Sequence, residues 1–471
     1  MNCKRLLVYL HVYFPGKRFI YCNQAEPGRM QSGRYALYDF GTALAISKIT
    51  CVIASPYRVC YILAAMKTDK IDFIDGGTVT SPQGFRAGGT AAGIKKKAKP
   101  ALDLGILFSG VPCVAAGVLT TSRIKSAPII LCQERLAKGR AVAIVANSGC
   151  ANAYTGEQGI KDANEMAGSA AFALGCKPED VFVASTGVTG QPLPIDLIKA
   201  GVRQVVLSTE GGHELARAIM TTDTVPKETA VIVRDGDTEF TIGGIAKGSG
   251  MIHPNMATMF GFLTTDAAVE LSFLRSVLHR VADISFNMIS VDGDTSPSDT
   301  VLLMANGLAK NKVISADSPM AEVFERALTQ VCVHLAKAIA RDGEGATRLI
   351  EVTVQGAATV ANARLAARTI VGSSLVKTAV YGGDPNWGRI IAALARSGAE
   401  LVESKIDLEI GKVKVLKNGR PLSFREADVI GVFKEDKVPI SIDLNIGSGS
   451  ATAWGCDLTP EYVKINSEYM T

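Results

Sequence analysis

Buried-strand and helix patterns alternate along most of the chain. Continuous apolar runs at 141–149 and 181–190 each end in a polar, glycine-containing turn, which predicts buried β-strands. Residues 162–175 have apolar positions with helical spacing and a closing glycine, which predicts a helix between these strands. Residues 228–248 predict a β-hairpin, in which Asp235-Gly236 supplies the turn. The order of strand, helix and strand favours a mixed α/β fold.

The second half of the chain continues the mixed pattern. Residues 271–288 predict a helix, and Ser318 and Pro319 begin another as its N-cap and first-turn proline. The elements predicted after it are a strand at 349–357, a helix at 361–371, strands at 405–410, 412–416 and 439–447, and a turn at Asn418-Gly419. A chain of 471 residues exceeds one ordinary core. We therefore predict a main α/β domain over 66–345 and a C-terminal α/β domain over 346–471.

The first 65 residues follow a different pattern. Their apolar clusters are broken by proline and glycine, and no period of 3.6 or 2 is sustained. From Met66 onward a strand-like run and a glycine turn begin. We interpret Met66 as the true start and residues 1–65 as a non-native or disordered extension. The alternative is that these residues form a real but poorly ordered tail. Because the segment has few acidic residues, a mitochondrial transit peptide is a further alternative.

Composition and charge narrow the function classes. Apolar residues make up 47% of the chain, enough for a large core, and a net charge of +5 is too small for a dedicated nucleic-acid binder. The ten cysteines include no C-x-x-C pair and the five histidines form no ligand-spaced cluster, so we expect no metal site. Scattered single cysteines are typical of a reduced, cytoplasmic protein. No apolar run reaches the roughly 20 residues of a membrane span.

The segment 247–267 suggests self-cleavage chemistry. A glycine-rich stretch precedes an apolar run that contains Ala257-Thr258. A threonine hydroxyl can attack the peptide bond before it when the preceding residue is small and its carbonyl group is held in a strained position. The attack forms an ester, and water then opens this ester to free a chain that begins with Thr258. The new terminus carries its own base, because an α-amino group has a pKa of about 7.7–8.0. A threonine in an ordinary β-strand is the alternative that the local residues alone favour.

Segments from about residue 70 to the end resemble the ArgJ family, the ornithine acetyltransferase and glutamate N-acetyltransferase enzymes of arginine biosynthesis. MIHPNMATMFGFLTTDA at 251–267 is similar to the cleavage segment of that family. The other matching segments, in the order of the family, are NSGCANAYTG (147–156), ASTGVTG (184–190), MTTDTVPK (220–227), AKGSGM (246–251), DGDTSPSDT (292–300), ARDGEGATRLIEV (340–352), YGGDPNWGRI (381–390) and YVKINSEYMT (462–471). Each segment alone is a weak signal, but so many at coherent spacing are specific.

The resemblance implies catalytic roles for three residues and a cleavage site. Thr258 corresponds to the nucleophile and to the new N-terminus after cleavage behind Ala257. Thr186 and Gly187 correspond to the oxyanion hole. A glycine-rich turn after a buried strand can present a hydroxyl and a backbone N–H to developing negative charge. Without the resemblance, a plain tight turn is the better interpretation of these residues.

The resemblance also implies a substrate site. Glu344 would hold the ammonium group of ornithine, and Lys247 would pair with a carboxylate. Thr221 matches a substrate-binding threonine, although Thr222 is close enough to be confused with it. Two further residues match positions that close over the substrate: Asn466 and the terminal Thr471.

The chain departs from the usual family pattern at a few positions. Cys150 stands where many relatives have asparagine, and Pro297-Ser298 replaces the commoner Thr-Asn. These departures place local turn geometry in question more than activity, and a small buried thiol is the better interpretation of Cys150. The sharpest charge run, best interpreted as a solvated face, consists of Lys95, Lys96, Lys97 and Lys99.

The implied reaction is a ping-pong transfer of acetyl from N-acetylornithine to glutamate without a cofactor, and whether acetyl-CoA also serves as a substrate stays open. The implied fold is a layered α/β sandwich similar to self-cleaving aminopeptidases of the DmpA type. Cleavage would give an α chain of 66–257 and a β chain of 258–471, which the family assembles as α2β2 or larger. Two rival interpretations are a hydrolase of the same fold and an uncleaved binding protein.

Overall fold

The computed structural model describes residues 70–96, 101–253 and 259–468, together with the backbone of six strands between residues 6 and 64. Residues 1–68 and 69–471 form two compact units. The first unit contains three antiparallel hairpins, formed by β1 (Leu6–Phe14) with β2 (Lys17–Ala25), β3 (Ala36–Asp39) with β4 (Thr42–Ala45), and β5 (Ile49–Ala54) with β6 (Val59–Ala64). Met66 lies outside the described residues, so the proposed start there stays a prediction.

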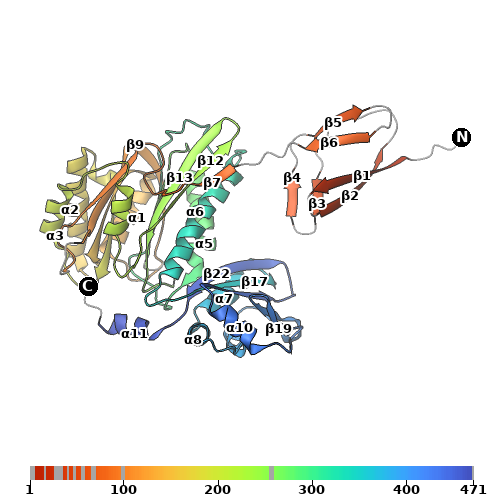
Figure 1. Cartoon of the computed structure of the whole chain (residues 1–471). Coiled ribbons are helices and arrows are strands. Elements are labelled where there is room, and N and C mark those ends of the chain that lie inside the picture. The colour runs from red at the N-terminus through yellow and green to blue at the C-terminus, as the bar shows by residue number, and fades with distance from the viewer. Residues whose placement is uncertain are drawn as a thin grey trace. The chain divides into compact units, whose positions relative to one another are not determined.

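A nine-stranded sheet forms the larger part of the second unit (Figure 1). Its strand β9 (Leu104–Leu119) changes neighbours along its length. Residues 104–109 pair with β8 (Phe85–Thr90), residues 104–114 with β10 (Arg140–Cys150), and residues 114–119 with β16 (Thr300–Ala305). On the far side of β16, the sheet continues with β14 (Phe260–Thr265), β13 (Thr238–Lys247), β12 (Lys227–Asp235) and β7 (Lys70–Phe73). At the opposite edge of the sheet, β11 (Val181–Val188) pairs with β10. Strand β14 therefore lies in the sheet between β13 and β16.

Helices cover this sheet and enclose two cores. Helices α5 (Leu271–Ile284) and α6 (Ala321–Arg341) pack against each other and against β9, β12 and β13 (Figure 1). Their apolar sides fill the first core, in which Leu278 and Phe324 are buried. The second core lies under α1 (Ala127–Lys138), α2 (Gly156–Leu174), α3 (Ile195–Val202) and α4 (Gly212–Ala218).

A seven-stranded sheet builds the C-terminal part of the second unit. Its strands in order are β15 (Ile289–Ser290), β22 (Gly449–Cys456), β17 (Leu349–Ala357), β21 (Lys437–Asp443), β18 (Asp407–Ile410), β19 (Val413–Lys417) and β20 (Arg420–Pro421). The accompanying helices are α7 (Val360–Val371), α8 (Ser374–Gly382), α9 (Gly388–Ala395), α10 (Glu426–Phe433) and α11 (Pro460–Ser467). Helix α7 packs against β17 and β22, and the alternating β17 residues Ile350, Val352 and Val354 are fully buried.

The mixed α/β prediction is confirmed, and most predicted elements are found. The strands predicted at 141–149, 181–190 and 349–357 are β10, β11 and β17, and the helix predicted at 162–175 is the later part of α2. The division of residues 66–471 into two domains at 345 stays a prediction. No helix among the described residues is long and apolar enough to cross a membrane.

Three element boundaries differ from the predictions. Asp235 pairs with Thr238 in the β-ladder, so the hairpin turn consists of Gly236 and Asp237, and Gly236 adopts a φ of +61°. Ser318 is not the N-cap of α6, because its hydroxyl accepts the Met320 N–H (3.2 Å) in a turn before the helix. Helix α5 ends at Ile284, since the Ser285 hydroxyl donates to the Val281 carbonyl (2.6 Å) as the backbone leaves the helical conformation.

Candidate active site

The predicted oxyanion turn lies where β11 ends beside β10. In this parallel pair, Thr186 is opposite Ser148 and Gly187 is opposite Gly149. Gly187 has a φ of +127°, and a Cβ atom there would lie 2.4 Å from the Gly149 carbonyl carbon. Only glycine fits this conformation and this close approach. Thr186 and Gly187 thus belong to the end of β11 itself, where they pair with β10, and not to a turn after the strand as expected from the sequence.

Lys247 reaches this end of β11 from another part of the sheet. It is the last residue of β13 and is 2% exposed. Its Nζ lies 3.5 Å from Oγ1 of Thr186, although β13 and β11 are not neighbours in the sheet. Burial lowers the pKa of Lys247, and the nearby carboxylates, chiefly Asp223, oppose this change. The structure thus brings two of the predicted site residues into contact.

A buried group of charges, which we call the site charge cluster, lies beside Lys247 and consists of Asp223, Lys227 and Asp342. The Lys227 ammonium contacts each of the two carboxylates at 2.6 Å. Burial alone would raise the pKa of Asp223, but Lys227 and Lys247 hold it well below the usual range. No sequence pattern predicts this cluster. The only available signal was the presence of all three residues in family-like motifs.

The predicted substrate residue Thr221 lies at the edge of the site charge cluster. Its backbone N–H donates to Oδ2 of Asp223 at 3.0 Å. The side chains of Thr221 and Thr222 are both half-buried. The geometry therefore keeps both threonines as candidates for the substrate contact.

Glu344 lies on the loop after α6 and is 7% exposed. Its backbone N–H donates to the Ser249 carbonyl (3.0 Å), and its Oε2 accepts the side-chain amide of Asn466 on α11 (2.7 Å). A Cβ atom at Gly250 would lie 2.4 Å from the Glu344 carboxyl carbon. Two more predicted residues, Glu344 and Asn466, are thus in contact, and glycine at 250 makes room for the carboxylate.

The segment 247–250 joins these two parts of the site. The Gly248 N–H donates to Asp223 (2.7 Å), and the Ser249 hydroxyl donates to the Asp342 carbonyl (2.6 Å). The same segment carries Lys247 at one end and contacts Glu344 at the other. The AKGSGM motif is therefore the physical link between the oxyanion turn and the predicted substrate carboxylate.

Three of the predicted residues, Ala257, Thr258 and Thr471, lie outside the described residues. The described chain resumes at Met259, which is fully buried, and β14 begins at the next residue. Phe260 pairs with Lys247 on one side and with Thr300 on the other. Met259, the residue bonded to Thr258, therefore directly precedes the strand residue that pairs with Lys247.

The other candidates from the sequence have surroundings typical of structural residues. Cys150 is buried among backbone carbonyls, and burial raises the pKa of its thiol. Lys95 donates to the Leu102 carbonyl at 2.9 Å, Lys96 is exposed, and Lys97 and Lys99 lie outside the described residues. No group of three His, Cys, Asp or Glu side chains within the described ranges is arranged to hold a metal ion.

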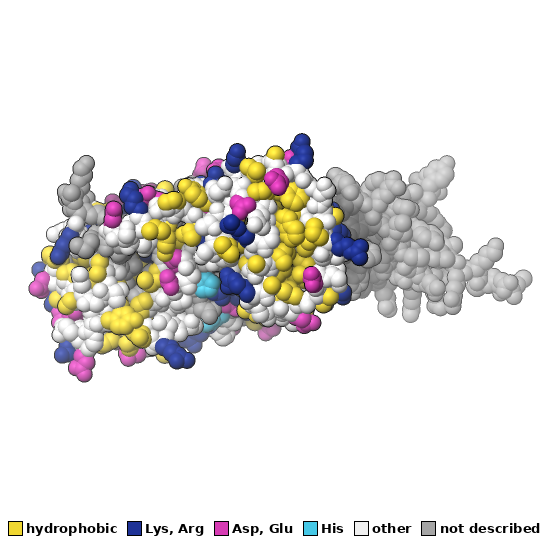
Figure 2. All heavy atoms as spheres, turned by 90° about the horizontal axis from the view of Figure 1, so that it is seen from below, with side chains coloured by type: hydrophobic (Ala, Val, Ile, Leu, Met, Phe, Trp, Pro, Cys, Tyr) yellow, Lys and Arg dark blue, Asp and Glu magenta, His cyan; other side chains and the backbone are white. Residues whose placement is uncertain are grey.

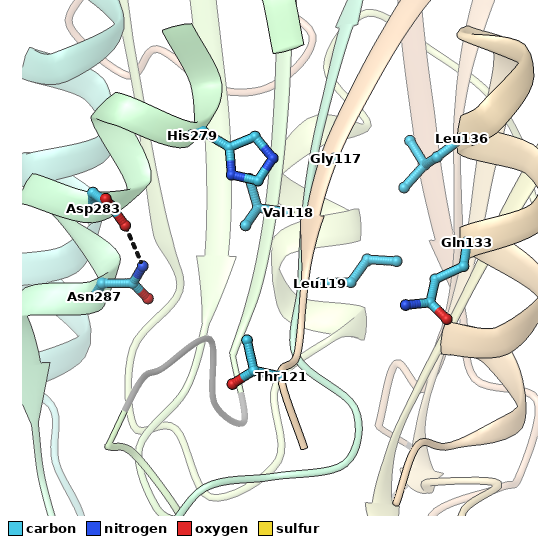
Figure 3. Close-up of a pocket in the computed structure, with 9 residues that line it drawn as sticks. All are labelled: Gly117, Val118, Leu119, Thr121, Gln133, Leu136, His279, Asp283 and Asn287. Carbon is cyan, nitrogen blue, oxygen red and sulfur yellow. Dashed lines mark hydrogen bonds between the residues drawn. The ribbon is translucent and has the colours of Figure 1, made fainter. Parts of the chain in front are cut away.

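A cavity of 490 Å³ lies between α1 and α5. Figure 3 shows its floor on β9 and its walls on the two helices, with Asp283 accepting the side-chain amide of Asn287 (3.0 Å). Its lining residues are Gly117, Val118, Leu119, Thr121, Gln133, Leu136, His279, Asp283 and Asn287. None of the predicted site residues that the structure describes lines this cavity.

Comparisons with known proteins agree with the motif pattern. Residues 86–471 match the sequence profile of the ArgJ family. The chain is 53% identical over 401 residues to the arginine biosynthesis bifunctional protein ArgJ of Dehalococcoides mccartyi, covering 85% of this chain and 99% of that protein. It is 54% identical over 403 residues to the protein of the same name from Symbiobacterium thermophilum, covering 85% and 100%. A crystal structure of Bacillus halodurans ArgJ is 48% identical, covers 45% of this chain and 98% of that chain, and superposes with a TM-score of 0.43.

Proposed function

The chain belongs to the ArgJ family, and from this premise we propose that it transfers the acetyl group of N-acetyl-L-ornithine to L-glutamate in arginine biosynthesis. Both substrates are small molecules. The reaction exchanges one amide for another, so its atoms balance without a redox partner or a nucleotide.

One observation carries the proposal: the Lys247 ammonium lies 3.5 Å from the Thr186 hydroxyl, beside the start of β14. Thr258 is bonded to Met259, the residue just before that strand. A nucleophile at position 258 would therefore act next to a hydroxyl, a glycine at the end of β11 and a buried ammonium. This combination suits attack on a carbonyl and stabilisation of the resulting oxyanion.

In the first reaction, the Thr258 hydroxyl attacks the Ala257 carbonyl carbon of its own chain. The resulting ester is opened by water, which leaves Thr258 with a free α-amine. That amine has a pKa near neutrality, so it can take the proton of the hydroxyl during later turnovers.

In the transfer reaction, the Thr258 hydroxyl attacks the acetyl carbonyl of N-acetylornithine. The Thr186 hydroxyl and the Gly187 N–H stabilise the oxyanion, each donor being worth about 3–4 kcal/mol of barrier. The C–N bond breaks, the ornithine nitrogen takes the proton held by the α-amine, and acetyl-Thr258 remains. The amine of glutamate then attacks this ester and leaves as N-acetylglutamate.

Substrate recognition follows from the charges of the site. Lys247 pairs with a substrate carboxylate, and its buried position strengthens that interaction. Glu344, steadied by Asn466, receives the ammonium group that distinguishes ornithine. The hydroxyl of Thr221, or of its neighbour Thr222, and the terminal Thr471 complete the proposed contacts.

We further propose that cleavage yields an α chain of 66–257 and a β chain of 258–471 that assemble as α2β2. Exposed apolar side chains such as Leu365 on α7 and Leu375 on α8 supply surface for such an assembly. Figure 2 shows hydrophobic side chains gathered in patches between charged ones on one face. A cytoplasmic location agrees with the described cysteines, which are free thiols.

The decisive experiment combines intact mass with an acetyl-transfer assay. We expect two fragments from the wild-type chain and one full-length product from Thr258→Ala, which should also lose transferase activity. The mass of the first fragment also tests the start at Met66. A full-length, active wild-type chain would contradict the proposal.

The hydrolase alternative is tested by incubating the protein with N-acetylornithine in the presence and absence of glutamate. Transfer predicts that product forms only when glutamate is present. Acetate released at the same rate without glutamate would instead establish a hydrolase. Replacing N-acetylornithine with acetyl-CoA in the same assay tests the second acetyl donor.

A further inference from the structure

One buried carboxylate joins the segments that carry the predicted substrate residues. The side chain of Asp223 is fully enclosed. Its Oδ2 accepts the backbone N–H of Thr221 at 3.0 Å. Its Oδ1 accepts the Lys227 ammonium at 2.6 Å and, directly after Lys247 in the chain, the backbone N–H of Gly248 at 2.7 Å. Both oxygens of Asp223 therefore already have partners from this chain.

The same carboxylate is connected to the loop that carries Glu344. Lys227 also donates to Asp342 at 2.6 Å, two residues before Glu344. The Asp342 carbonyl accepts the Ser249 hydroxyl (2.6 Å), and the Ser249 carbonyl accepts the Glu344 N–H (3.0 Å). Asp223 is thus linked to all three segments from which the substrate contacts at Thr221, Lys247 and Glu344 are predicted.

This arrangement leaves the Lys247 ammonium open for a ligand. Lys247 is 2% exposed, and among the described residues the Thr186 hydroxyl, 3.5 Å away, is its one hydrogen-bond partner. A lysine ammonium has three protons to donate. Burying a charge is costly unless an opposite charge pairs with it. The geometry therefore favours a carboxylate ligand at Nζ of Lys247.

The charged and titratable side chains that face this ammonium are Asp223, Lys227, Asp299 and Glu344. Burial lowers the pKa of Lys247, Asp223 opposes this most strongly, and Lys227 adds to the lowering. Burial raises the pKa of Asp299 well above its usual range, so Asp299 contributes less negative charge. Lys227 and Lys247 hold the pKa of Asp223 well below its usual range despite burial. Asp223 is therefore the main support of the positive charge on Lys247.

We propose that Asp223 is a positioning residue of the substrate site, which holds Lys247 and Thr221 in place for a substrate carboxylate. This role rests on the function proposed above. Because its oxygens are satisfied by Lys227, Gly248 and Thr221, Asp223 supports the positive charge without occupying the ammonium. The ligand class is an amino acid with a free α-carboxylate, a group that N-acetylornithine and glutamate share. Asp223 acts through its neighbours and does not contact the substrate.

The first test is Asp223→Asn in the full chain, with KM for N-acetylornithine measured over a series of pH values. Asparagine has a similar shape but no charge, and Lys227 keeps Asp342 as a partner. Neutral lysine binds a carboxylate weakly, so KM should rise as pH passes upward through the pKa of Lys247. Without the charge of Asp223 that pKa is lower. We expect the rise to begin about one pH unit or more below that of the wild type, with KM about tenfold higher there.

The maximal rate should change much less than KM. The carboxylate contact is made in the bound substrate and in the transition state alike, so its loss weakens binding without slowing the chemical step. The same alkaline change is expected when glutamate is varied as the acceptor. A merely structural role would lower the melting temperature and leave the pH dependence of KM as it is in the wild type.

Asp180→Asn is the matched control. Asp180 is a buried carboxylate immediately before β11, the strand that carries Thr186. It pairs with Arg140 at 2.7 Å. The substitution therefore removes a buried, ion-paired charge close to the opposite end of the same strand. We expect this variant to lose some stability and to keep the wild-type KM at every pH.

A second variant, Asp223→Glu, separates charge from position. Glutamate keeps the negative charge, but its extra methylene group displaces the carboxylate from the N–H groups of Thr221 and Gly248. We expect KM to rise severalfold at every pH, while the alkaline rise begins near the wild-type pH. This variant also decides the case in which Asp223→Asn does not fold, because an unchanged KM would then overturn the role.

The outcomes separate this role from the proposed function. An Asp223→Asn chain with the wild-type KM at every pH overturns the role of Asp223. An equal change in Asp180→Asn overturns it as well, since a general loss of stability would then explain both variants. A wild-type chain that transfers no acetyl group from N-acetylornithine to glutamate contradicts the proposed function itself.

Discussion

Two groups of charges near the end of helix α6 differ in their surroundings. In the site charge cluster, side chains are at most 8% exposed, and Asp342 directly follows the helix. The second group, which we call the sheet charge cluster, consists of Glu351 on β17, Lys337 on α6, Lys437 on β21 and Trp454 on β22. Glu351 contacts Lys337 and Trp454 at 2.9 Å and Lys437 at 3.0 Å, and Lys437 is 54% exposed.

The comparison shows how burial changes the contribution of similar ion pairs to stability. In the site charge cluster, each charge depends on the others, because water cannot replace a lost partner. In the sheet charge cluster, solvent reaches the lysines, so each pair adds only a modest stabilisation. Only the buried cluster connects to Lys247 and Glu344, through Gly248 and Ser249. The buried charges thus lie at the proposed site, whereas the more exposed charges link α6 to strands of the C-terminal sheet.

The largest expected effect comes from breaking the buried cluster. Lys227→Met leaves Asp223 and Asp342 as adjacent carboxylates without their cation, and we expect a loss of about 3–5 kcal/mol in the free energy of unfolding. Urea-induced unfolding measures this loss. Lys437→Met is the control from the exposed cluster and should cost under about 1 kcal/mol. Equal losses in the two variants would remove the distinction between the clusters.

A smaller effect is expected from neutralising the sheet charge cluster. Burial alone would raise the pKa of Glu351, but its lysine and tryptophan partners lower it to about 2. Its stabilising contribution is therefore present above the ordinary carboxyl pKa and is lost as pH falls toward 2. Glu351→Gln should cost about 1–3 kcal/mol at neutral pH and flatten the acid side of the stability curve. Transferase activity should not change, and a large loss of activity would link this cluster to the site.

The smallest effect separates recognition from stability. Asn466→Ala removes one hydrogen bond to Glu344, and we expect KM for N-acetylornithine to rise about tenfold, corresponding to about 1.4 kcal/mol. The melting temperature should hardly move, because α11 has no buried residue. Steady-state kinetics and thermal unfolding of the same preparation test both statements. A lower kcat with unchanged KM would contradict the assigned contact.

The elements best predicted from the sequence were those with a strong local signal. Strands β10 and β11 are buried on both faces, so each is a continuous apolar run in the sequence. The predicted start of α6 is wrong, because Ser318 has a side chain suited to an N-cap but its hydroxyl takes part in a turn before the helix. The contact between Thr186 and Lys247 joins residues 61 positions apart. No periodicity carries that information, and only the family resemblance pointed to it.

The unpredicted part of the site depends on contacts distant in sequence. Lys227 and Asp342 are 115 positions apart, so neither of the motifs that contain them indicates that their side chains pair. The buried Asp299 is another example, because its Oδ1 accepts the N–H of Met259, which lies 40 positions earlier in the chain.

The position of β14 has a consequence for the two fragments that cleavage would produce. The proposed cut would fall just before a strand whose backbone is bonded on one side to β13, which would belong to the first fragment, and on the other to β16, which would belong to the second. Separating the fragments would require opening a ladder inside the sheet and exposing its core. The two polypeptides should therefore melt in a single transition and should not exchange with fragments from other molecules while folded.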